Sequence, residues 1–287
     1  FRLAVYLFTS PNFSSNIWWM GILYAFEVVL LVVEFIFLML QNHRISSIAG
    51  LLGILFGVAA ISNLGGVFAM LNGREFWYGP YLPLFFIASA LMTGSAAVVF
   101  FTVIASRIRR EPIAPAMANS LKAVGKLALL MLAVVMFFTL WRMVALTVGG
   151  AGARLAFDAR VAGPFAFTFW IFEVFFGMIV PFALLMGSRG RRIGVMFLAA
   201  TLMIFSTFFA RLDMVVAGQI VPLYWDLGVK EFSRLHTYAP TWHEILVVLG
   251  GIGLCGVAFL LGETVFSGFR EAAGPSATQN GKVDDEP

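Results

Sequence analysis

Residues 17–40 read IWWMGILYAFEVVLLVVEFIFLML, and Glu27 and Glu34 carry the only charges in this stretch. A helix of about 20 apolar residues is long enough to cross the hydrocarbon core of a bilayer. Hydropathy over a window of this length is the main sequence signal of a membrane-spanning helix. Residues 17–40 are therefore predicted to span a membrane.

The same pattern recurs along the chain. Further apolar runs lie at 46–71, 81–105, 121–148, 165–187, 193–217 and 243–266. Hydrophobic residues make up 61% of the chain and charged residues 12%, whereas soluble domains are about a quarter charged. We predict an all-α, polytopic transmembrane bundle of seven helices over residues 1–266, followed by a polar, disordered tail over 267–287.

The breaks between these runs alternate between two sides of the membrane. One side receives the basic groups around Arg44, Arg107–Arg110 and Arg189–Arg192, and we predict that it is cytoplasmic. The loops at 72–80, 149–164 and 218–242 then lie on the outer side. Most Trp and Tyr residues at the ends of the runs gather on that outer side, as is typical of a membrane interface.

Seven charged residues fall inside or at the ends of the predicted spans: Glu27, Glu34, Arg142, Glu173, Arg211, Asp213 and Glu244. Each such charge costs about 2.5–3.5 kcal/mol on insertion scales, so these side chains usually face a bundle interior or a cavity. All except Glu34 fall in the outer half of the membrane. This asymmetry favours a functional polar cavity near the outer face, and structural ion pairs between helices are the alternative.

Individual residues allow two interpretations. Glu27 and Glu34 share one helix face, where they form either a proton path or a buried seam. Arg142 and Arg211 are expected to hold carboxylates ionised. Glu244 follows Pro240 and Thr241 at the start of the last run, where it either caps the helix or also handles a proton.

Cofactor chemistry within the chain is limited by its composition. The single Cys255 excludes a cysteine-held iron–sulfur cluster. The three histidines, His43, His236 and His243, lie at loops or helix ends, where they do not form a bis-histidine haem site. We predict neither haem nor an iron–sulfur cluster in this chain.

Four segments in order resemble the polysulfide-reductase membrane-subunit (NrfD-like) family. They are IWWMGILYAFEVVLLVVEFIFLML (17–40), REFWYGPYLPLFFIASALMTGSAAVV (74–99), FFARLDMVVAGQIVP (208–222) and HTYAPTWHEILVVLGGIGL (236–254). The family includes the membrane subunits of hydrogenase-2-type and sulfur-metabolism complexes. Its members have eight to ten helices, so we expect this chain to be the C-terminal part of such a subunit.

The resemblance implies a multi-pass subunit of a respiratory complex in the bacterial cytoplasmic (inner) membrane. Such a subunit exchanges electrons with menaquinone or ubiquinone and holds no redox metal itself. The implied partners are an iron–sulfur ferredoxin-like subunit and a catalytic subunit, either a molybdopterin enzyme or a hydrogenase. No nucleic-acid partner is expected, because the basic residues are scattered among hydrophobic spans.

These expectations lead to a set of candidate site residues, all of which except Glu34 are expected toward the outer face. Candidates for quinone binding are Tyr238, His243, Glu244, Arg211, Asp213, Ser62 and Asn63. Glu173, Glu27 and Glu34 are candidates for proton transfer, and Arg142 is a candidate structural charge partner.

Two other classes of protein remain open. A secondary transporter also keeps charges at depth, but usually near the midplane and in an inverted repeat, and no repeat is visible here. A structural anchor would tether an enzyme without binding quinone.

Overall fold

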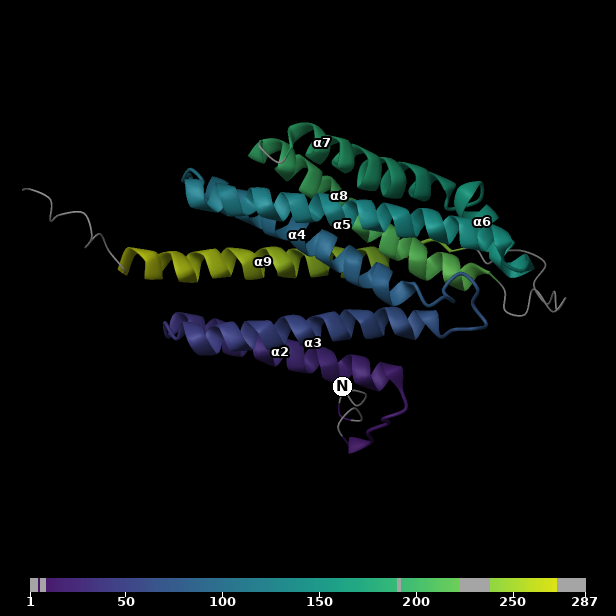
Figure 1. Cartoon of the computed structure of the whole chain (residues 1–287), viewed down its shortest axis with the longest axis horizontal. Coiled ribbons are helices and arrows are strands. Elements are labelled where there is room, and N and C mark those ends of the chain that lie inside the picture. The colour runs from purple at the N-terminus through teal and green to yellow at the C-terminus, as the bar shows by residue number, and fades with distance from the viewer. Residues whose placement is uncertain (1–4, 6–8, 190–191, 222–237, 273–287) are drawn as a thin grey trace, which may run out of the picture. The chain divides into compact units, whose positions relative to one another are not determined.

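The computed structural model describes residues 5, 9–189, 192–221 and 238–272 (Figure 1). All regular elements within these ranges are helices. Seven helical stretches in the described residues are long and apolar enough to cross a membrane. The predicted all-α polytopic fold is confirmed for this part of the chain.

Most of the helices are longer than the predicted runs, and α6 (Ala151–Val161) was not expected. In chain order they are α2 (Asn16–Met39), α3 (His43–Ala69), α4 (Leu82–Arg109), α5 (Pro115–Val148), α6 (Ala151–Val161), η1 (Thr168–Ile179), α7 (Val180–Ser188), α8 (Ile193–Ile220) and α9 (Trp242–Ala272).

The breaks predicted at 106–120 and 149–164 both contain helical residues that were not expected. Residues 115–120 form the first turns of α5, because Pro115 occupies the first helical position, where its missing N–H removes no hydrogen bond. The 149–164 segment contains α6, which begins after the extended residues Gly149 and Gly150. A helix too short to span had no hydropathy signal by which to detect it.

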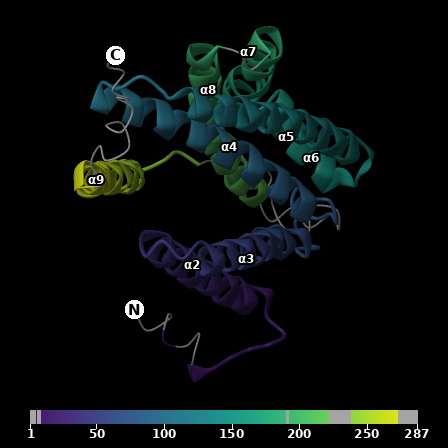
Figure 2. The same ribbon diagram turned by 60° about the vertical axis from the view of Figure 1, so that its left-hand side comes forward.

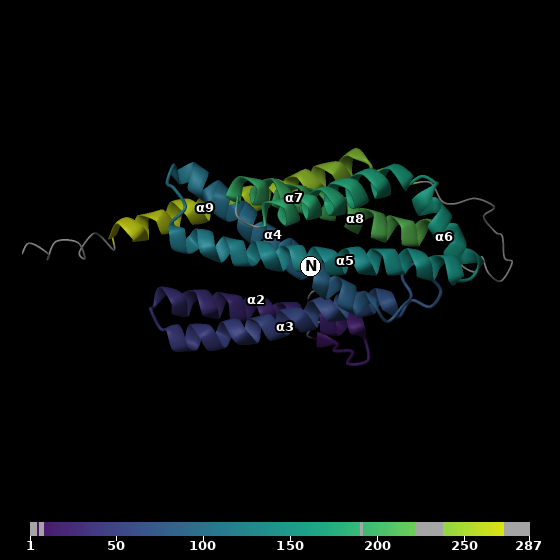
Figure 3. The ribbon, with the colours of Figure 1, turned by 45° about the horizontal axis from the view of Figure 1, so that its top comes forward.

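Helices α2 and α3 form an antiparallel hairpin, and α3 also packs against α4. Figures 1 and 3 both show the hairpin, drawn in purple and dark blue. Its short turn has Gln41 in the left-handed region, at φ 60°. The Asn42 side chain then caps α3 by accepting a hydrogen bond from the Ile45 N–H at 3.3 Å.

Helices α4, α5, α7 and α8 enclose the main apolar core of the described residues. Figure 2 shows these four helices as one group. Met92, Leu132, Leu185 and Met196 are among its buried side chains. Burial of such side chains stabilises a membrane bundle through close packing rather than through exclusion of water, because lipid tails are as apolar as the core.

The loop between α3 and α4 covers the C-terminal end of α8. Its Trp77 donates a hydrogen bond from Nε1 to the Met214 carbonyl at 2.8 Å. Its Arg74 donates from Nη1 to the carbonyls of Gly218, Gln219 and Val221 at 3.2, 3.1 and 2.7 Å. The last carbonyls of a helix lack partners within the helix, so this arginine satisfies groups that would otherwise be unpaired.

A π-helix interrupts the span that runs from Thr168 to Ser188. It occupies η1 and ends just before Pro181, which lies at the start of α7. Proline has no N–H and its ring clashes with the carbonyl four residues earlier, so a regular α-helical ladder cannot continue through this point. Pro181 therefore accounts for a local change of helical geometry next to Glu173.

Helix α9 belongs to a separate unit, residues 238–287, and is described by itself. It extends to Ala272, so residues 267–272, which were predicted to begin the tail, are helical. The rest of that predicted tail, residues 273–287, lies outside the described residues.

Candidate functional site

A charged cluster is buried where α5, α6, η1 and α8 meet, and it consists of Arg142, Arg160, Glu173, Arg211 and Asp213. Arg142, Arg160, Glu173 and Asp213 are only 5%, 1%, 4% and 1% exposed. Charged side chains are almost never buried to this degree unless they are paired. Four of the five residues were predicted from their depth in the spans, and the structure brings these four together.

Arg160 was missed as a member of this cluster. The sequence placed it in a loop, whereas it lies in the last turn of α6 and forms an ion pair with Glu173. Helix α6 follows shortly after α5 and packs beside the C-terminal end of α5 (Figure 3). The sequence signal that could have revealed this helix is the small-residue series Ala153, Ala156 and Ala159, which forms its buried face.

Aromatic rings hold the guanidinium groups in place. The Phe76 ring centroid lies 3.8 Å from Arg142 Cζ and 5.6 Å from Arg160 Cζ. The Phe76 carbonyl also accepts a hydrogen bond from Arg142 Nη2 at 3.1 Å. Cation–π contacts of desolvated arginines are worth about 2 kcal/mol. The ring of the buried loop residue Phe76 therefore links α5 and α6, and its backbone carbonyl adds a second contact to α5.

Arg211 faces α4 rather than a carboxylate. Its Nη2 donates to the Ser89 hydroxyl at 2.6 Å, and its Cζ lies 4.2 Å from the Phe86 ring centroid. Within the described residues, neither Arg211 nor Arg142 makes an ion pair. The expectation that these two arginines pair with carboxylates was wrong for the described residues, because the ion pair with Glu173 is formed by Arg160.

A cavity of about 40 Å³ lies inside this cluster, and Arg142, Arg160, Glu173, Ser206 and Arg211 are among its lining residues. One water needs about 10–15 Å³ measured in this way. The cavity therefore has room for about three or four water-sized groups.

A second polar site lies on the α2–α3 hairpin. Within the described part of the chain, the carboxylates of Glu27 and Glu34 make no hydrogen bond or ion pair. Glu27 lies against Gly57, where an added Cβ would be 2.7 Å from Oε1, and Glu34 lies against Gly50, where it would be 2.6 Å away. The two glycines thus form notches in α3 that receive the two carboxylates.

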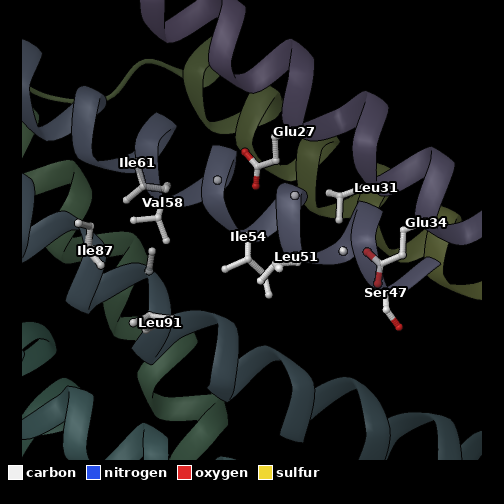
Figure 4. Close-up of a pocket in the computed structure, with 14 residues that line it drawn as sticks. Glu27, Leu31, Glu34, Ser47, Leu51, Ile54, Val58, Ile61, Ile87 and Leu91 are labelled. Carbon is white, nitrogen blue, oxygen red and sulfur yellow. The ribbon is translucent and has the colours of Figure 1, made fainter. Parts of the chain in front are cut away.

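These carboxylates line an open groove of about 630 Å³ between α2, α3 and α4. Figure 4 shows both acids on α2 directed toward α3, with Leu31 between them and apolar side chains along the other walls. The groove lies within the size range of small-molecule pockets, which are mostly apolar with a few polar groups.

The predicted donors Ser62 and Asn63 lie next to Ile61, a residue of this groove, but do not themselves line it. Asn63 donates from Nδ2 to the Asn16 carbonyl at 2.7 Å, which joins α3 to the first turn of α2. Asn63 therefore has a structural partner within the hairpin.

The candidates at the start of α9 form a local capping arrangement. Glu244 Oε2 accepts hydrogen bonds from the Thr241 N–H at 2.8 Å and from the Tyr238 hydroxyl at 3.1 Å, and the Thr241 hydroxyl faces the Glu244 N–H at 3.4 Å. This reciprocal pattern is a capping box. Partial desolvation, the hydrogen bond to Glu244 and its negative charge raise the pKa of Tyr238. His243 lies between the capping residues, in the first turn of α9.

Comparisons with known proteins identify similar sequences. Residues 2–222 match the profile of the family described as NrfD, polysulphide reductase. A selenate reductase subunit of Mesobacillus selenatarsenatis is 24% identical over 224 residues, which are 77% of this chain and 50% of that protein. A membrane subunit assigned to dimethyl sulfoxide reductase in Halobacterium salinarum is 27% identical over 221 residues, 71% of this chain and 49% of that protein. This chain spans about half the length of these curated relatives.

Proposed function

Because this chain belongs to the NrfD polysulphide reductase family, we propose that it is a membrane subunit of an oxidoreductase complex and exchanges electrons with the quinone pool. The partners in this proposal are an iron–sulfur subunit and a catalytic subunit, a molybdopterin enzyme or a hydrogenase. The location is the bacterial cytoplasmic membrane. The names of the two relatives, which are subunits of selenate and dimethyl sulfoxide reductases, support a place in a reductase complex.

The groove beside Glu27 and Glu34 is the observation that carries the quinone proposal. A quinone is a flat, largely apolar ring with two carbonyl oxygens, and its reduction to quinol takes up two electrons and two protons. The groove provides about 630 Å³, apolar walls from three helices and two carboxylates. The cavity in the charged cluster, at about 40 Å³, is too small for such a ring.

The two carboxylates are the proton-handling groups in this proposal. Glu27 and Glu34 are seven residues apart on one helix face, which places them about 10.5 Å apart along the axis. Glu27 would exchange a proton at the headgroup, and Glu34 would carry it along α2 toward the side assigned as cytoplasmic.

The remaining candidates keep supporting roles in the proposal. Ser62 and Asn63 would approach the headgroup from the end of α3, and Tyr238, His243 and Glu244 at the start of α9 stay proposed quinone ligands. Arg211, Asp213 and Glu173 would influence the charge of the site from the neighbouring cluster, with Arg142 as their structural partner.

The proposal is tested in membranes that contain the complete complex. Glu27→Gln and Glu34→Gln keep the shape of the side chain but remove the titratable group, so each is expected to lower quinone-linked electron transfer by about tenfold or more. Glu111→Gln, in the exposed loop between α4 and α5, is the matched control. Catalytic activity measured with an artificial electron donor should remain unchanged in all three variants.

Two results would contradict the proposal. Unchanged quinone-linked transfer in both groove variants would remove the groove from the pathway and favour a structural anchor. Copurification of the chain without any redox subunit, together with transport of a solute, would favour a secondary transporter.

A further inference from the structure

The charged cluster contains more positive than negative charge. Its arginines, Arg142, Arg160 and Arg211, cannot be deprotonated in a protein, so they contribute three positive charges. Glu173 and Asp213 contribute at most two negative charges, even when both are ionised. The five residues therefore carry a net charge of at least +1 in a region that is almost closed to solvent.

Three other groups that could carry a negative charge lie near the cluster, but none of them lines its cavity. Asp158 is on α6 but is exposed. Glu75 lies in the loop before α4, against Gly149. Tyr81 lies close to Arg142 and Arg160, but burial raises the pKa of its phenol and the two guanidiniums offset only part of that rise, so it stays neutral. Among the described residues that line the cavity, three are arginines and one, Glu173, is a carboxylate.

An excess buried charge is strongly unfavourable. Removing one partner from a buried ion pair costs about 3–5 kcal/mol, because it leaves a charge without compensation in a region of low dielectric constant. Charged groups within a membrane bundle consequently pair with one another or with groups in a cavity. A negative charge in the cavity would therefore stabilise the three arginines that line it.

The cavity offers a site for that charge. Four guanidinium nitrogens of its lining residues are buried without a hydrogen-bond partner among the described residues: Arg142 Nε, Arg160 Nε, Arg160 Nη1 and Arg211 Nη1. Guanidinium nitrogens are donors only and have no acceptor capacity. Three arginines from three helices thus line a cavity of about 40 Å³ and carry buried N–H groups without a partner among the described residues.

We propose that this cavity binds one small monovalent anion of the chloride class between Arg142, Arg160 and Arg211. The net positive charge opposes a metal cation or hydronium ion. The volume excludes a quinone ring and is sufficient for an ion of the size of chloride. Such an ion accepts several N–H hydrogen bonds at once and lowers the net charge of the cluster by one. The site is distinct from the groove proposed for quinone, so either proposal can fail without the other.

The first test uses the purified complex in detergent, with chloride replaced by gluconate at constant ionic strength. Thermal stability is expected to rise with added chloride or bromide in a saturable manner and to show no rise with further gluconate. In a bromide-exchanged crystal, anomalous scattering should place one bromide ion in the cavity. Density for water alone, with no bromide peak in the cavity, would overturn the proposal.

The second test separates this site from halide binding elsewhere, using two variants that each remove one buried charge. Arg142→Gln removes a positive charge and a free N–H, so the halide concentration at half-maximal stabilisation should increase by about tenfold or more. Asp213→Asn removes a negative charge, so the same concentration should stay equal or decrease. General destabilisation would not produce opposite shifts.

The test can still be decided if one of the two variants fails to fold. If Arg142→Gln does not yield folded protein, Asp213→Asn and the anomalous map still decide the question. An unchanged half-maximal concentration in Arg142→Gln, or a tenfold increase in Asp213→Asn, would show adventitious binding only and overturn the proposal.

Discussion

The carboxylate of Glu27 on α2 occupies a notch in α3 that exists because residue 57 is glycine. An added Cβ at Gly57 would lie 2.7 Å from Glu27 Oε1, and the pair Glu34 and Gly50 repeats this arrangement seven residues away along both helices. The antiparallel register of the hairpin therefore places each carboxylate opposite a glycine. This relationship determines how the groove presents its acids.

Filling the notches is expected to impair function without loss of folding. Gly57→Ala and Gly50→Ala would push the flexible carboxylates out of α3, and quinone-linked electron transfer should decrease. Alanine favours a helix over glycine by about 1 kcal/mol, so the thermal midpoint should stay equal or rise. Gly53→Ala is the control, because its Cβ would meet only Leu30 and Leu31 at 3.9 Å. Equal electron transfer in Gly53→Ala and Gly57→Ala would contradict this prediction.

The ion pair between Arg160 and Glu173 should show strong coupling. Arg160→Met alone and Glu173→Gln alone each leave a buried charge without its partner, and each is expected to cost about 3–5 kcal/mol of unfolding free energy. The double change to Met and Gln removes both charges, so it should cost less than the sum of the single changes. Thermal unfolding of the four proteins gives the coupling energy as a double-mutant cycle, and additive effects would indicate that the pair is not formed.

Arg74 is expected to stabilise the C-terminal end of α8. Arg74→Ala removes the three hydrogen bonds to the carbonyls of Gly218, Gln219 and Val221. Hydrogen bonds that involve a charged group contribute about 1.5–3 kcal/mol each when buried, but Arg74 is partly exposed. We expect a loss of about 1–3 kcal/mol in total. Arg154→Ala, an exposed arginine on α6, should have little effect, and equal losses in both variants would contradict this assignment.

The contact between η1 and α8 requires a glycine at residue 177. A Cβ there would overlap the Ser206 hydroxyl, which itself donates to the Phe172 carbonyl at 2.5 Å. Gly177→Ala should therefore be strongly destabilising, by more than the about 1–3 kcal/mol typical of overpacking. Adding Ser206→Gly removes the overlapping atoms and should restore part of the stability. Hydrogen exchange over η1 and α8 measures both effects, and failure of the second change to restore protection would locate the strain elsewhere.

The spans could be predicted from sequence because hydropathy is a local property. Residues 17–40 had to become a membrane helix wherever the rest of the chain lay, and the structure places α2 at Asn16–Met39. Helix α6, within the predicted break at 149–164, was missed because it depends on tertiary contacts rather than on a local property. Helix α6 is stabilised by packing against α5, η1 and α8, and such contacts leave no hydrophobic run long enough to detect.

The sequence by itself determined that the chain crosses the membrane and that charges lie inside the spans, because the cost of a charge in lipid belongs to each residue separately. Only the tertiary structure decided which charges meet. The fold-back of α6 joins Arg160 to Glu173, and the hairpin register sets Glu27 against Gly57. These pairings depend on how separate helices pack together, and no local pattern in the sequence encodes those contacts.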